Sequence, residues 1–421
     1  MEKRAIMQSA NPVLPVVGFM EAQLLPPRQA IVAFFSRVAV APPPIERVPL
    51  DAALGRVLAE PAVADGDYPA APRALMDGFA VCARATPGEF AIVGDVRMGR
   101  DPLAVITAET ASRIPTGGVL PEGADAVVPL EDARVRNDEL VVDAPIAPGT
   151  NVAQRGADMQ RGEIVIPPHR RIRGGDVGVL ATLGLTEVPV YRRPTIAVFS
   201  SGDELVDLSA SPSPSQVRDS NRHAVAASLR AMGAMPRHYP TLRDEAEEFE
   251  SSLTTALAEC DAVVVTGGSS VGERDRLPNA VAAIADPGIL VHGLRVKPGK
   301  PTLFGADGKK PILGLPGNPT SALLILEAVA APIVAALVGA PLAASSLQAR
   351  LAEPARSRAN WTWYIPVRLQ DDGGVPLAHP LPLRSFSVSL TARADGYIVL
   401  DERQEECPAG TVVTVYRFLG A

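Results

Sequence analysis

From residue 195 to about residue 340, short apolar runs alternate with segments whose apolar residues recur at helical spacing. The runs predict strands over residues 195–201, 261–266, 289–296 and 311–315, and the periodic segments predict helices over residues 221–232, 244–259, 276–285 and from 320 onward. This alternation is typical of a parallel sheet that helices cover on both faces, so a doubly wound α/β domain is predicted over residues 191–340. Because ligands of such sheets bind beyond the carboxyl ends of the strands, the loops that follow the strands are the first candidates for a site.

The segment before this domain follows two other patterns. Apolar residues recur at helical spacing from Ile31 to Val38, so residues 1–60 are predicted to be mainly helical, and another helix is predicted from 174 to 183. Between residues 61 and 144, short β-prone runs are separated by Gly and Pro. They predict a small β-rich domain with a hairpin that turns at Asn137-Asp138.

The segment after the α/β domain is rich in strands again. Two β-prone runs, 361–369 and 375–383, flank an Asp-Asp-Gly-Gly turn at 371–374. They predict a small C-terminal β domain over residues 341–421.

Composition narrows the class of protein. A chain of 421 residues is expected to form about two to four domains. A net charge of −7 offers no basic field to a phosphate backbone, so no nucleic-acid partner is expected. Three widely spaced cysteines form neither a disulfide framework nor a zinc motif, which predicts a reducing compartment: Cys82, Cys260 and Cys407.

The longest apolar stretch lies between Ala322 and Ala344. Glu327 and Pro332 interrupt it, and neither uninterrupted piece reaches the roughly 20 residues that cross a bilayer. The stretch is therefore predicted to be a helix buried in the α/β domain, and no membrane association is expected. The first 20 residues show no clear targeting signal, so a cytoplasmic location is expected.

Carboxylates follow several of the predicted strands. Asp203 and Glu204 end the first strand of the α/β domain, Asp219 precedes the next helix, and Glu273 and Asp275 belong to the loop TGGSSVGERD at 266–275. If these loops converge, their carboxylates would repel a phosphate unless a hard divalent cation such as Mg²⁺ lies between them. The alternative reading is structural, because Asp219 or Asn221 could cap the following helix and Asp203 could close a turn.

The loop TGGSSVGERD also suits an anion. Gly267 and Gly268 let backbone N–H groups approach closely, and Ser269 and Ser270 add donors. It is not a Walker A loop, because Glu273 stands where the lysine should follow the glycine. A tight turn without a ligand is the alternative.

Two further loops carry cationic or helix-capping groups. VKPGKP at 296–301 holds Lys297 and Lys300 on a chain stiffened by proline, which suits phosphate neutralisation, although a solvated pair of lysines is the alternative. LPGNPTSA at 315–322 places Asn318 as the N-cap and Pro319 as the first residue of a helix. The exposed N–H groups of such a helix start bind anions, but a well-made helix start needs no ligand.

Asp77, in ALMDGFAV at 74–81, and Thr116, in the Gly- and Pro-rich segment 114–132, lie outside the α/β domain. Their spacing alone assigns them no role.

Taken together, these strings resemble one family, the molybdopterin molybdenumtransferases (MoeA-like proteins and the homologous E domain of gephyrin). The resemblance spans residues from about 50 to 340 and continues at 385–400. The motifs occur in the order of the family: MDGFAV, IPTGG, GADAVV, NVAQRGADMQRGE, LGLTEVPV, SSGDEL, RDSNR, TGGSSVGERD, VKPGKP, LPGNP and SFSVSLTARADGYIVL.

The resemblance implies a homodimer of four-domain subunits. A discontinuous, mainly helical, elongated domain would cover 1–60 and 145–190, followed by the β-rich domain at 61–144, the doubly wound domain at 191–340 and a β-barrel-like domain at 341–421. It also implies a reaction in which molybdate and adenylylated molybdopterin react with Mg²⁺ to give molybdenum cofactor and AMP. Molybdoenzymes or cofactor carriers would then be possible partners.

The family's site residues carry over onto this sequence as follows. Glu204, Asp219 and Asp275 would bind the metal, and catalysis would involve Asp275, Glu204, Asp77 and Lys297. Asp77 and Thr116 would close the site from the opposite subunit. The ligand would be bound by the remaining residues: Thr116, Asp219, Asn221, Gly267, Gly268, Ser270, Lys300, Pro316, Gly317, Asn318 and Pro319.

The sequence departs from the family's pattern at Leu75 and Ser269, and Arg274 and Arg276 flank Asp275. These departures concern the fine geometry of the ligand and leave a tungsten-preferring transferase open. A non-catalytic molybdopterin-binding or scaffolding paralogue is the alternative from another class. The adenylyltransferase that makes the substrate is a third reading, which the additional domains disfavour.

Overall fold

The computed structural model describes residues 24–243, 245–269, 276–342, 345–383 and 387–419. Contacts divide these residues into two compact units. The larger unit contains the described residues of Met1–Val48, Ala53–Ala59 and Pro189–Ala421, and the smaller unit contains Pro49–Ala52 and Glu60–Val188. Each unit has hydrophobic clusters of its own.

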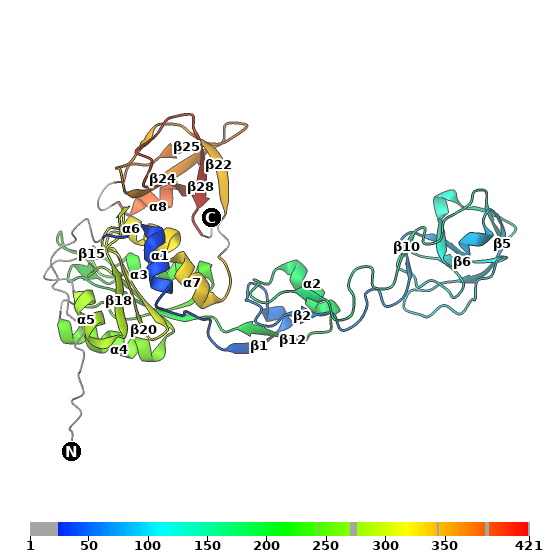
Figure 1. Ribbon diagram of the computed structural model, residues 1–421, viewed down its shortest axis with the longest axis horizontal. Coiled ribbons are helices and arrows are strands. Elements are labelled where there is room, and N and C mark those ends of the chain that lie inside the picture. The colour runs from blue at the N-terminus through cyan, green and yellow to red at the C-terminus, as the bar shows by residue number, and fades with distance from the viewer. Residues whose placement is uncertain (1–23, 244, 270–275, 343–344, 384–386, 420–421) are drawn as a thin grey trace, which may run out of the picture. The chain divides into compact units, whose positions relative to one another are not determined.

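The centre of the larger unit is a six-stranded sheet with the order β16-β13-β17-β21-β20-β18 (Figure 1). Its strands are β13 (Thr195–Ser200), β16 (Met235–His238), β17 (Ala262–Thr266), β18 (Pro287–His292), β20 (Leu303–Asp307) and β21 (Lys310–Leu315). β13, β16, β17 and β21 run parallel, whereas β20 runs antiparallel to both of its neighbours. The prediction of an all-parallel sheet is therefore wrong at β20. Only residues 308 and 309 connect β20 to β21, and so short a connection joins antiparallel strands.

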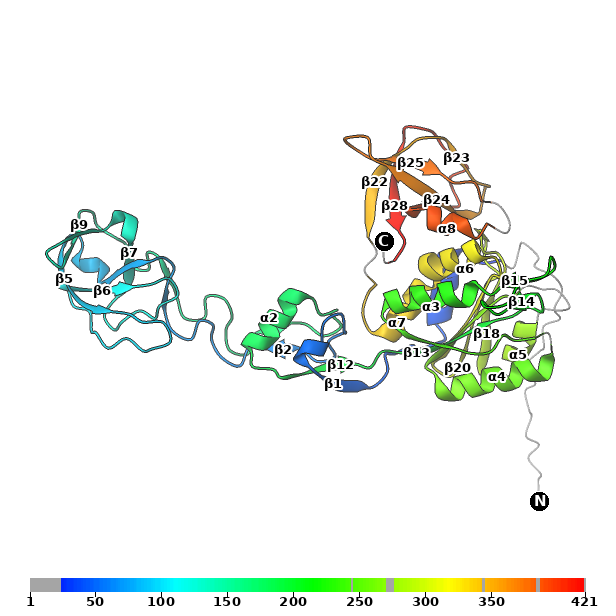
Figure 2. The same cartoon turned by 180° about the vertical axis from the view of Figure 1, so that it is seen from behind.

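Helices cover both faces of this sheet (Figures 1 and 2), as the sequence predicts. One face carries α4 (Ala246–Glu259) and α5 (Arg276–Ile284), and the other carries α1 (Pro27–Phe35), α3 (Asn221–Met232), α6 (Pro319–Ile325) and α7 (Ala331–Val338). Within β13, Ile196 and Val198 belong to the core on the α3 side. Ala197 and Phe199 belong to the core on the α4 side. Because successive side chains of a strand point to opposite faces, a strand covered on both faces must be apolar throughout.

The long apolar stretch is a core helix with a wide turn inside it. α6 continues through a π-helical turn (Leu326–Ala330) into α7, and Pro332 directly follows this turn, where the regular ladder of helix hydrogen bonds is already interrupted. Among the described residues, the helical stretch Pro319–Val338 is long and apolar enough to cross a membrane, by length and composition only. Its most apolar window is 61% buried, and Leu324, Ile333 and Val334 are fully buried.

The C-terminal part of the larger unit is a closed sheet. Its order is β19-β24-β25-β22-β28-β26, and a further pairing of β24 with β26 closes it, which confirms the barrel-like prediction. The sheet consists of β19 (Val296–Lys297), β22 (Ser346–Leu351), β24 (Thr362–Gln370), β25 (Leu377–Pro380), β26 (Gly396–Leu400) and β28 (Val412–Arg417), with β23 (Ala355–Arg356), β27 (Glu406–Cys407) and α8 (Ser389–Arg393) beside it. The strand predicted over 289–296 is thus divided between two sheets: β18 ends at His292, and β19 pairs with β24.

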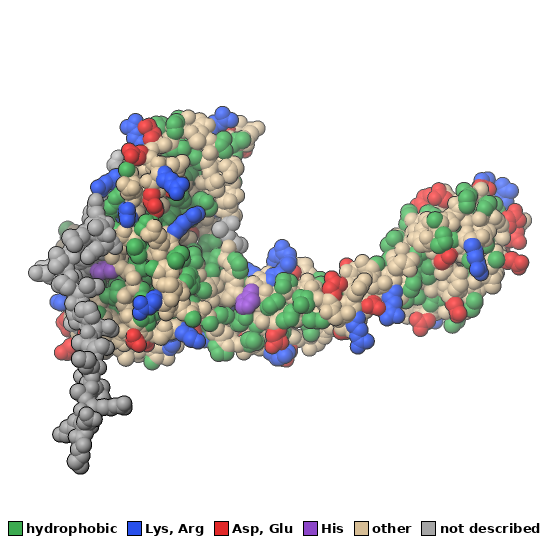
Figure 3. Space-filling model, viewed as in Figure 1, with side chains coloured by type: hydrophobic (Ala, Val, Ile, Leu, Met, Phe, Trp, Pro, Cys, Tyr) green, Lys and Arg blue, Asp and Glu red, His purple; other side chains and the backbone are tan. Residues whose placement is uncertain are grey.

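The smaller unit contains a six-stranded sheet with the order β7-β4-β6-β5-β9-β8. Its strands are β4 (Gly78–Val81), β5 (Gly88–Asp95), β6 (Thr110–Ile114), β7 (Ala126–Pro129), β8 (Arg134–Arg136) and β9 (Glu139–Val142). Asn137 and Asp138 have φ angles of +48° and +62° and join β8 to β9, so the predicted hairpin is confirmed. On the face shown in Figure 3, basic and acidic side chains are interspersed over the described surface.

The prediction of mainly helical structure over 1–60 and 145–190 is wrong for the described residues. They contain two α-helices of nine residues each, α1 and α2 (Gly174–Thr182). The neighbouring strands are β1 (Ile45–Pro49), β2 (Ala62–Val63), β3 (Arg73–Ala74), β10 (Val152–Ala153), β11 (Ile164–Ile166) and β12 (Glu187–Tyr191). Prolines at 42–44, 49, 148, 167, 168 and 189 remove backbone donors and confine helix to short windows. The division into four domains stays a prediction.

Candidate ligand site at the carboxyl edge of the central sheet

A cavity of about 830 Å³ lies where β13, β17 and β21 end. Parallel strands bring their carboxyl ends to one edge of a sheet, so the loops that follow them meet there. The predicted site residues that line this cavity are Glu204, Asp219, Asn221, Gly267, Gly268, Gly317, Asn318 and Pro319. Asp275 and Ser270 lie outside the described residues.

Gly267 and Gly268 form the floor of the cavity in a backbone conformation that suits glycine. Their φ angles are +84° and +62°. A Cβ atom on Gly267 would lie 2.5 Å from the carbonyl oxygen of Ser201, closer than real contacts allow. The glycines therefore permit two strand-end loops to touch, and they leave the backbone of the cavity floor uncovered by side chains.

Asp219 is anchored by hydroxyl and backbone donors. It is 2% exposed, and its Oδ1 accepts hydrogen bonds from Ser200 Oγ at 2.8 Å and from the backbone N–H of Arg222 at 3.1 Å. Its Oδ2 has no hydrogen-bond partner among the described residues and lies 3.3 Å from Arg222 Nε. The contact with the Arg222 N–H agrees with the capping alternative, and Oδ2 keeps an unused acceptor position.

The start of α6 is tied to the start of α3. Asn318 Oδ1 accepts from the N–H and the hydroxyl of Ser321, both at 3.1 Å, and Pro319 is the first helical residue, so the predicted N-cap is confirmed. Asn221 Nδ2 donates to the carbonyl oxygen of Gly317 at 2.7 Å. Asn221 Oδ1 is buried and has no partner among the described residues. This oxygen is therefore an acceptor available beside the cavity.

The two predicted cationic residues do not line the cavity, where the sequence predicts them. Neither Lys297 nor Lys300 is among the residues that line the cavity, and Pro316 is also absent from that lining. Lys297 is exposed, and its Nζ lies 4.6 Å from the centre of the Trp363 ring. A cation over an indole ring is stabilised there, so this arrangement directs Lys297 toward the C-terminal barrel.

Ser269 connects the Gly-rich loop to the lysine-bearing loop. Its hydroxyl donates to the carbonyl oxygen of Pro301 at 2.6 Å and lies 3.2 Å from that of Leu315. The carbonyl oxygen of Ser269 lies 3.1 Å from His292 Nε2. Ser269 is 2% exposed, so this departure from the family's pattern serves a buried hydrogen-bond network.

Of the carboxylates predicted to meet at this edge, the structure describes Asp203, Glu204 and Asp219, whereas Glu273 and Asp275 lie outside the described residues. Glu204 is exposed and lines the cavity, whereas Asp203 does not line it. Within the described ranges, no group of three or more His, Cys, Asp or Glu side chains could hold a metal ion. The predicted metal site, which includes Asp275, stays a prediction, because Asp275 lies outside those ranges.

In the smaller unit, Asp77 and Thr116 contact each other. Asp77 Oδ1 accepts hydrogen bonds from the backbone N–H of Thr116 at 2.6 Å and from its hydroxyl at 2.8 Å. These two donors, the backbone N–H foremost, hold the pKa of the Asp77 carboxyl below its usual value. The carboxylate is exposed and ionised near neutral pH.

Comparisons with known proteins cover most of the chain. Residues 25–184 match the "MoeA N-terminal region (domain I and II)", residues 197–336 a "Probable molybdopterin binding domain", and residues 348–418 the "MoeA C-terminal region (domain IV)". A molybdopterin molybdenumtransferase from Nostoc is 33% identical over 69% of this chain and 68% of the relative. A Synechocystis protein of the same name is 29% identical over 87% of this chain and 93% of the relative.

Among solved structures, a molybdopterin biosynthesis MoeA protein from Pyrococcus horikoshii is 30% identical. The match covers 94% of this chain and all of that one, with a TM-score of 0.79. The chain belongs to the molybdopterin molybdenumtransferase family.

Three features of this family member's cavity escaped sequence reasoning. Ser200 and Thr266 hydroxyls, 3.0 Å apart, lie beneath Asp219. The sequence contains a pattern that indicates these two residues: a hydroxyl residue ends each strand, in the strings SSG and TGG. Val388, from the C-terminal part of the chain, also lines the cavity. Its contact depends on how the barrel packs on the α/β domain, which no local pattern reports.

Proposed function

We propose that this chain inserts molybdate into adenylylated molybdopterin in a Mg²⁺-dependent reaction that releases AMP, as a step of molybdenum cofactor biosynthesis. Family membership supports the general process. The observation that carries the rest is the meeting of the Gly267-Gly268 backbone with the capped start of α6 at one cavity. Backbone N–H groups and a helix N-terminus stabilise phosphate anions, so the pyrophosphate of the adenylylated ligand would lie between them.

The residues present fit a hard cation in part. Glu204 lines the cavity, and Asp219 Oδ2 is a buried acceptor without a hydrogen bond among the described residues. Together with Asp275, these carboxylates would hold Mg²⁺, which would neutralise charge on the phosphoanhydride. Asp219 Oδ1 accepts from the backbone N–H of Arg222, so Asp219 would still orient the start of α3 when its Oδ2 binds metal.

Other predicted residues would complete the site. Lys300, and Lys297 once released from Trp363, would neutralise pyrophosphate and molybdate. Asn221 Oδ1 would accept a hydrogen bond from the ligand. In a homodimer, Asp77 and Thr116 of the opposite subunit would close the site, with Asp77 acting in catalysis. Ser270 and Pro316 would contribute further ligand contacts.

The direct test is AMP release from adenylylated molybdopterin by the full chain, with molybdate and Mg²⁺. Reconstitution of a molybdoenzyme apoprotein would be scored beside it, and parallel reactions would use Asp275→Asn and tungstate. We expect molybdate-dependent AMP release with active cofactor, and loss of both in the variant. Omission of Mg²⁺ is expected to abolish release, because the phosphoanhydride charge then stays unneutralised.

Other outcomes would assign other functions. Faster release with tungstate than with molybdate would identify a tungsten-preferring transferase. Tight ligand binding without AMP release under either oxyanion would contradict the enzyme proposal and leave a binding or scaffolding protein.

A further inference from the structure

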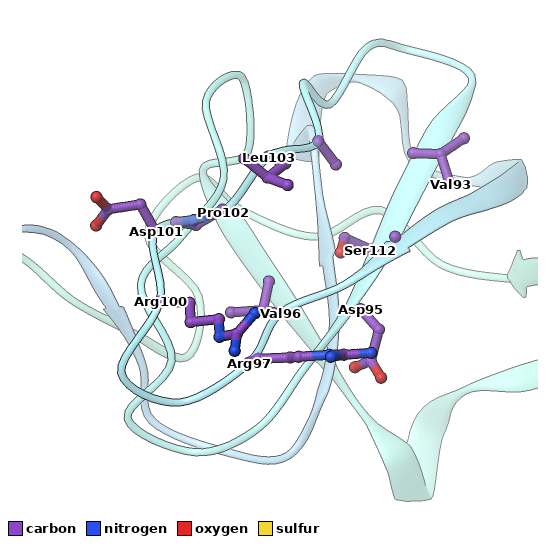
Figure 4. Close-up of a pocket in the computed structure, with 11 residues that line it drawn as sticks. Val93, Asp95, Val96, Arg97, Arg100, Asp101, Pro102, Leu103 and Ser112 are labelled. Carbon is purple, nitrogen blue, oxygen red and sulfur yellow. The ribbon is translucent and has the colours of Figure 1, made fainter.

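A second cavity, of about 420 Å³, lies in the sheet of the smaller unit (Figure 4). It is bounded by the end of β5, the start of the connection from β5 to β6, and Ser112 of β6. Its lining is Val93, Gly94, Asp95, Val96, Arg97, Arg100, Asp101, Pro102, Leu103, Ala104 and Ser112. No part of the proposed reaction uses it.

Arg97 and Arg100 are brought to this cavity by a tight turn. The backbone N–H of Arg100 donates to the carbonyl oxygen of Arg97 at 3.2 Å, and Gly99 within the turn has a φ angle of +74°. This reversal places the two arginines on the same side of the chain. In the view of Figure 4, the exposed Arg100 side chain points toward Arg97, Arg97 runs toward Asp95, and the Asp101 carboxylate points away from both arginines.

Three other arginines of this unit have partners. Arg73 donates to the carbonyl oxygen of Gly117, Arg113 lies over the Phe79 ring, and Arg134 pairs with Asp143. Over the part of the chain that the structure describes, the Arg97 and Arg100 side chains make no hydrogen bond or ion pair. The lining holds two guanidinium groups and two carboxylates, Asp95 and Asp101, and neither carboxylate forms an ion pair with Arg97 or Arg100 among the described residues.

The wall opposite the arginines offers a polar group and an apolar rim. Ser112 is 1% exposed, and Gly94 leaves room in front of it, because a Cβ atom on Gly94 would lie 3.1 Å from Ser112 Oγ. The pairing of β5 with β6 slips between Ile92 and Gly94, a bulge of the kind that redirects side chains at functional sites. Leu103 is 98% exposed at the rim.

We propose that this cavity binds a tetrahedral oxyanion, free or as a phosphate monoester, between the guanidinium groups of Arg97 and Arg100. Arginine presents a planar pair of donors that matches two oxygens of such an anion. The Ser112 hydroxyl, which donates to the carbonyl oxygen of Arg113 at 3.3 Å, turns to the anion when it binds, and Leu103 contacts the organic part of a monoester. Its lining residues are all different from those of the cavity in the larger unit.

The test uses the full chain and measures protection of individual arginines from phenylglyoxal by mass spectrometry. The probes are inorganic phosphate, molybdate and AMP, applied separately. We expect each bound anion to protect Arg97 and Arg100, and not Arg136, which is exposed on β8 of the same sheet. Stronger protection by AMP than by phosphate would identify a monoester as the preferred form, and equal protection would identify the free anion.

A binding titration of variants completes the test. Arg97→Gln with Arg100→Gln is expected to weaken anion binding at this site by at least about tenfold, while Arg136→Gln leaves it unchanged. AMP release from adenylylated molybdopterin is measured on the same samples, so loss of the proposed reaction is distinguished from loss of this site. Equal labelling of Arg97, Arg100 and Arg136 with and without every anion would overturn the proposal.

Discussion

Asn221 Nδ2 donates a hydrogen bond to the carbonyl oxygen of Gly317, 2.7 Å away, across 96 positions of sequence. The bond joins the first residue of α3 to the loop that precedes α6. It therefore fixes the distance between two loops that line the same cavity.

Asn221→Ala should loosen the loop before α6. We expect a loss of about 1 kcal/mol in the free energy of unfolding and a KM for adenylylated molybdopterin raised by roughly tenfold. Urea unfolding and steady-state AMP release measure the two effects. Arg230→Ala, on the exposed face of α3, is the control and should change neither. An unchanged KM in Asn221→Ala would contradict a role in positioning this loop.

Gly267→Ala should damage both fold and site. The alanine would adopt a φ angle of +84°, and its Cβ would meet the Ser201 carbonyl oxygen at 2.5 Å. We expect a loss of about 1–3 kcal/mol or more in the free energy of unfolding, and loss of AMP release. Gly174→Ala is the matched control, since a Cβ there meets nothing within 4 Å, and it should be neutral or slightly stabilising. Equal stability of the two variants would refute the steric argument.

Glu327 should make stability depend on pH. Burial raises the pKa of this carboxyl above 4.5, although Leu419 N–H and the Ser228 hydroxyl donate to it and oppose the shift. Between the usual and the raised pKa, the folded chain keeps a proton that the unfolded chain has released. The free energy of unfolding therefore falls as pH rises through that window and is level above it.

Glu327→Gln removes this titration. In urea unfolding from pH 4 to pH 8, the free energy of unfolding of the original chain minus that of the variant should fall with rising pH and then become constant. Glu247→Gln, an exposed change on α4, controls for loss of a carboxylate and should show no such trend. If the free energies of unfolding of the original chain and of Glu327→Gln change with pH in parallel, the Glu327 carboxyl does not titrate as predicted.

Thr116→Val should raise the pKa of Asp77 toward its usual value, because one of two donors is removed while the backbone N–H stays. A carboxyl with a lowered pKa stabilises the fold above its usual pKa, and that contribution disappears as pH falls through the lowered value. Titration of the Asp77 carboxyl by NMR measures the shift. Thr116→Ser keeps the hydroxyl and should leave the pKa low, and a low pKa in the valine variant too would show that the hydroxyl contributes nothing.

The elements with local signals were predictable. α3 extends from Asn221 to Met232, as its periodicity and the following Gly233 indicate, and the start of α6 at Pro319 follows from Asn318. β20 was missed because its five residues include Gly305 and Asp307, which are types depleted in strands, and only the hairpin to β21 defines it. Helix was overestimated before residue 60, where periodicity is local and the prolines that interrupt it decide the outcome.

The candidate site was predictable where it depends on strand ends and not where it depends on distant contacts. The loops that hold Glu204, Gly267 and Asn318 meet because parallel strands end at one edge. The direction of Lys297 depends on Trp363, a residue of the barrel that no spacing connects to it. Long-range packing of this kind overrides local expectation.

The pairing of β19 with β24 has a mechanical consequence. Val296 and Lys297 continue the chain that leaves the central sheet, yet they are hydrogen-bonded to Thr362 and Trp363 as an edge strand of the barrel. The lysine-bearing loop therefore belongs to the barrel sheet while it continues the chain of the central sheet. A rotation of the barrel about β19 would move Lys297 with it. In the proposed reaction, the packing of the barrel would thereby set the distance from the Lys297 ammonium group to the pyrophosphate.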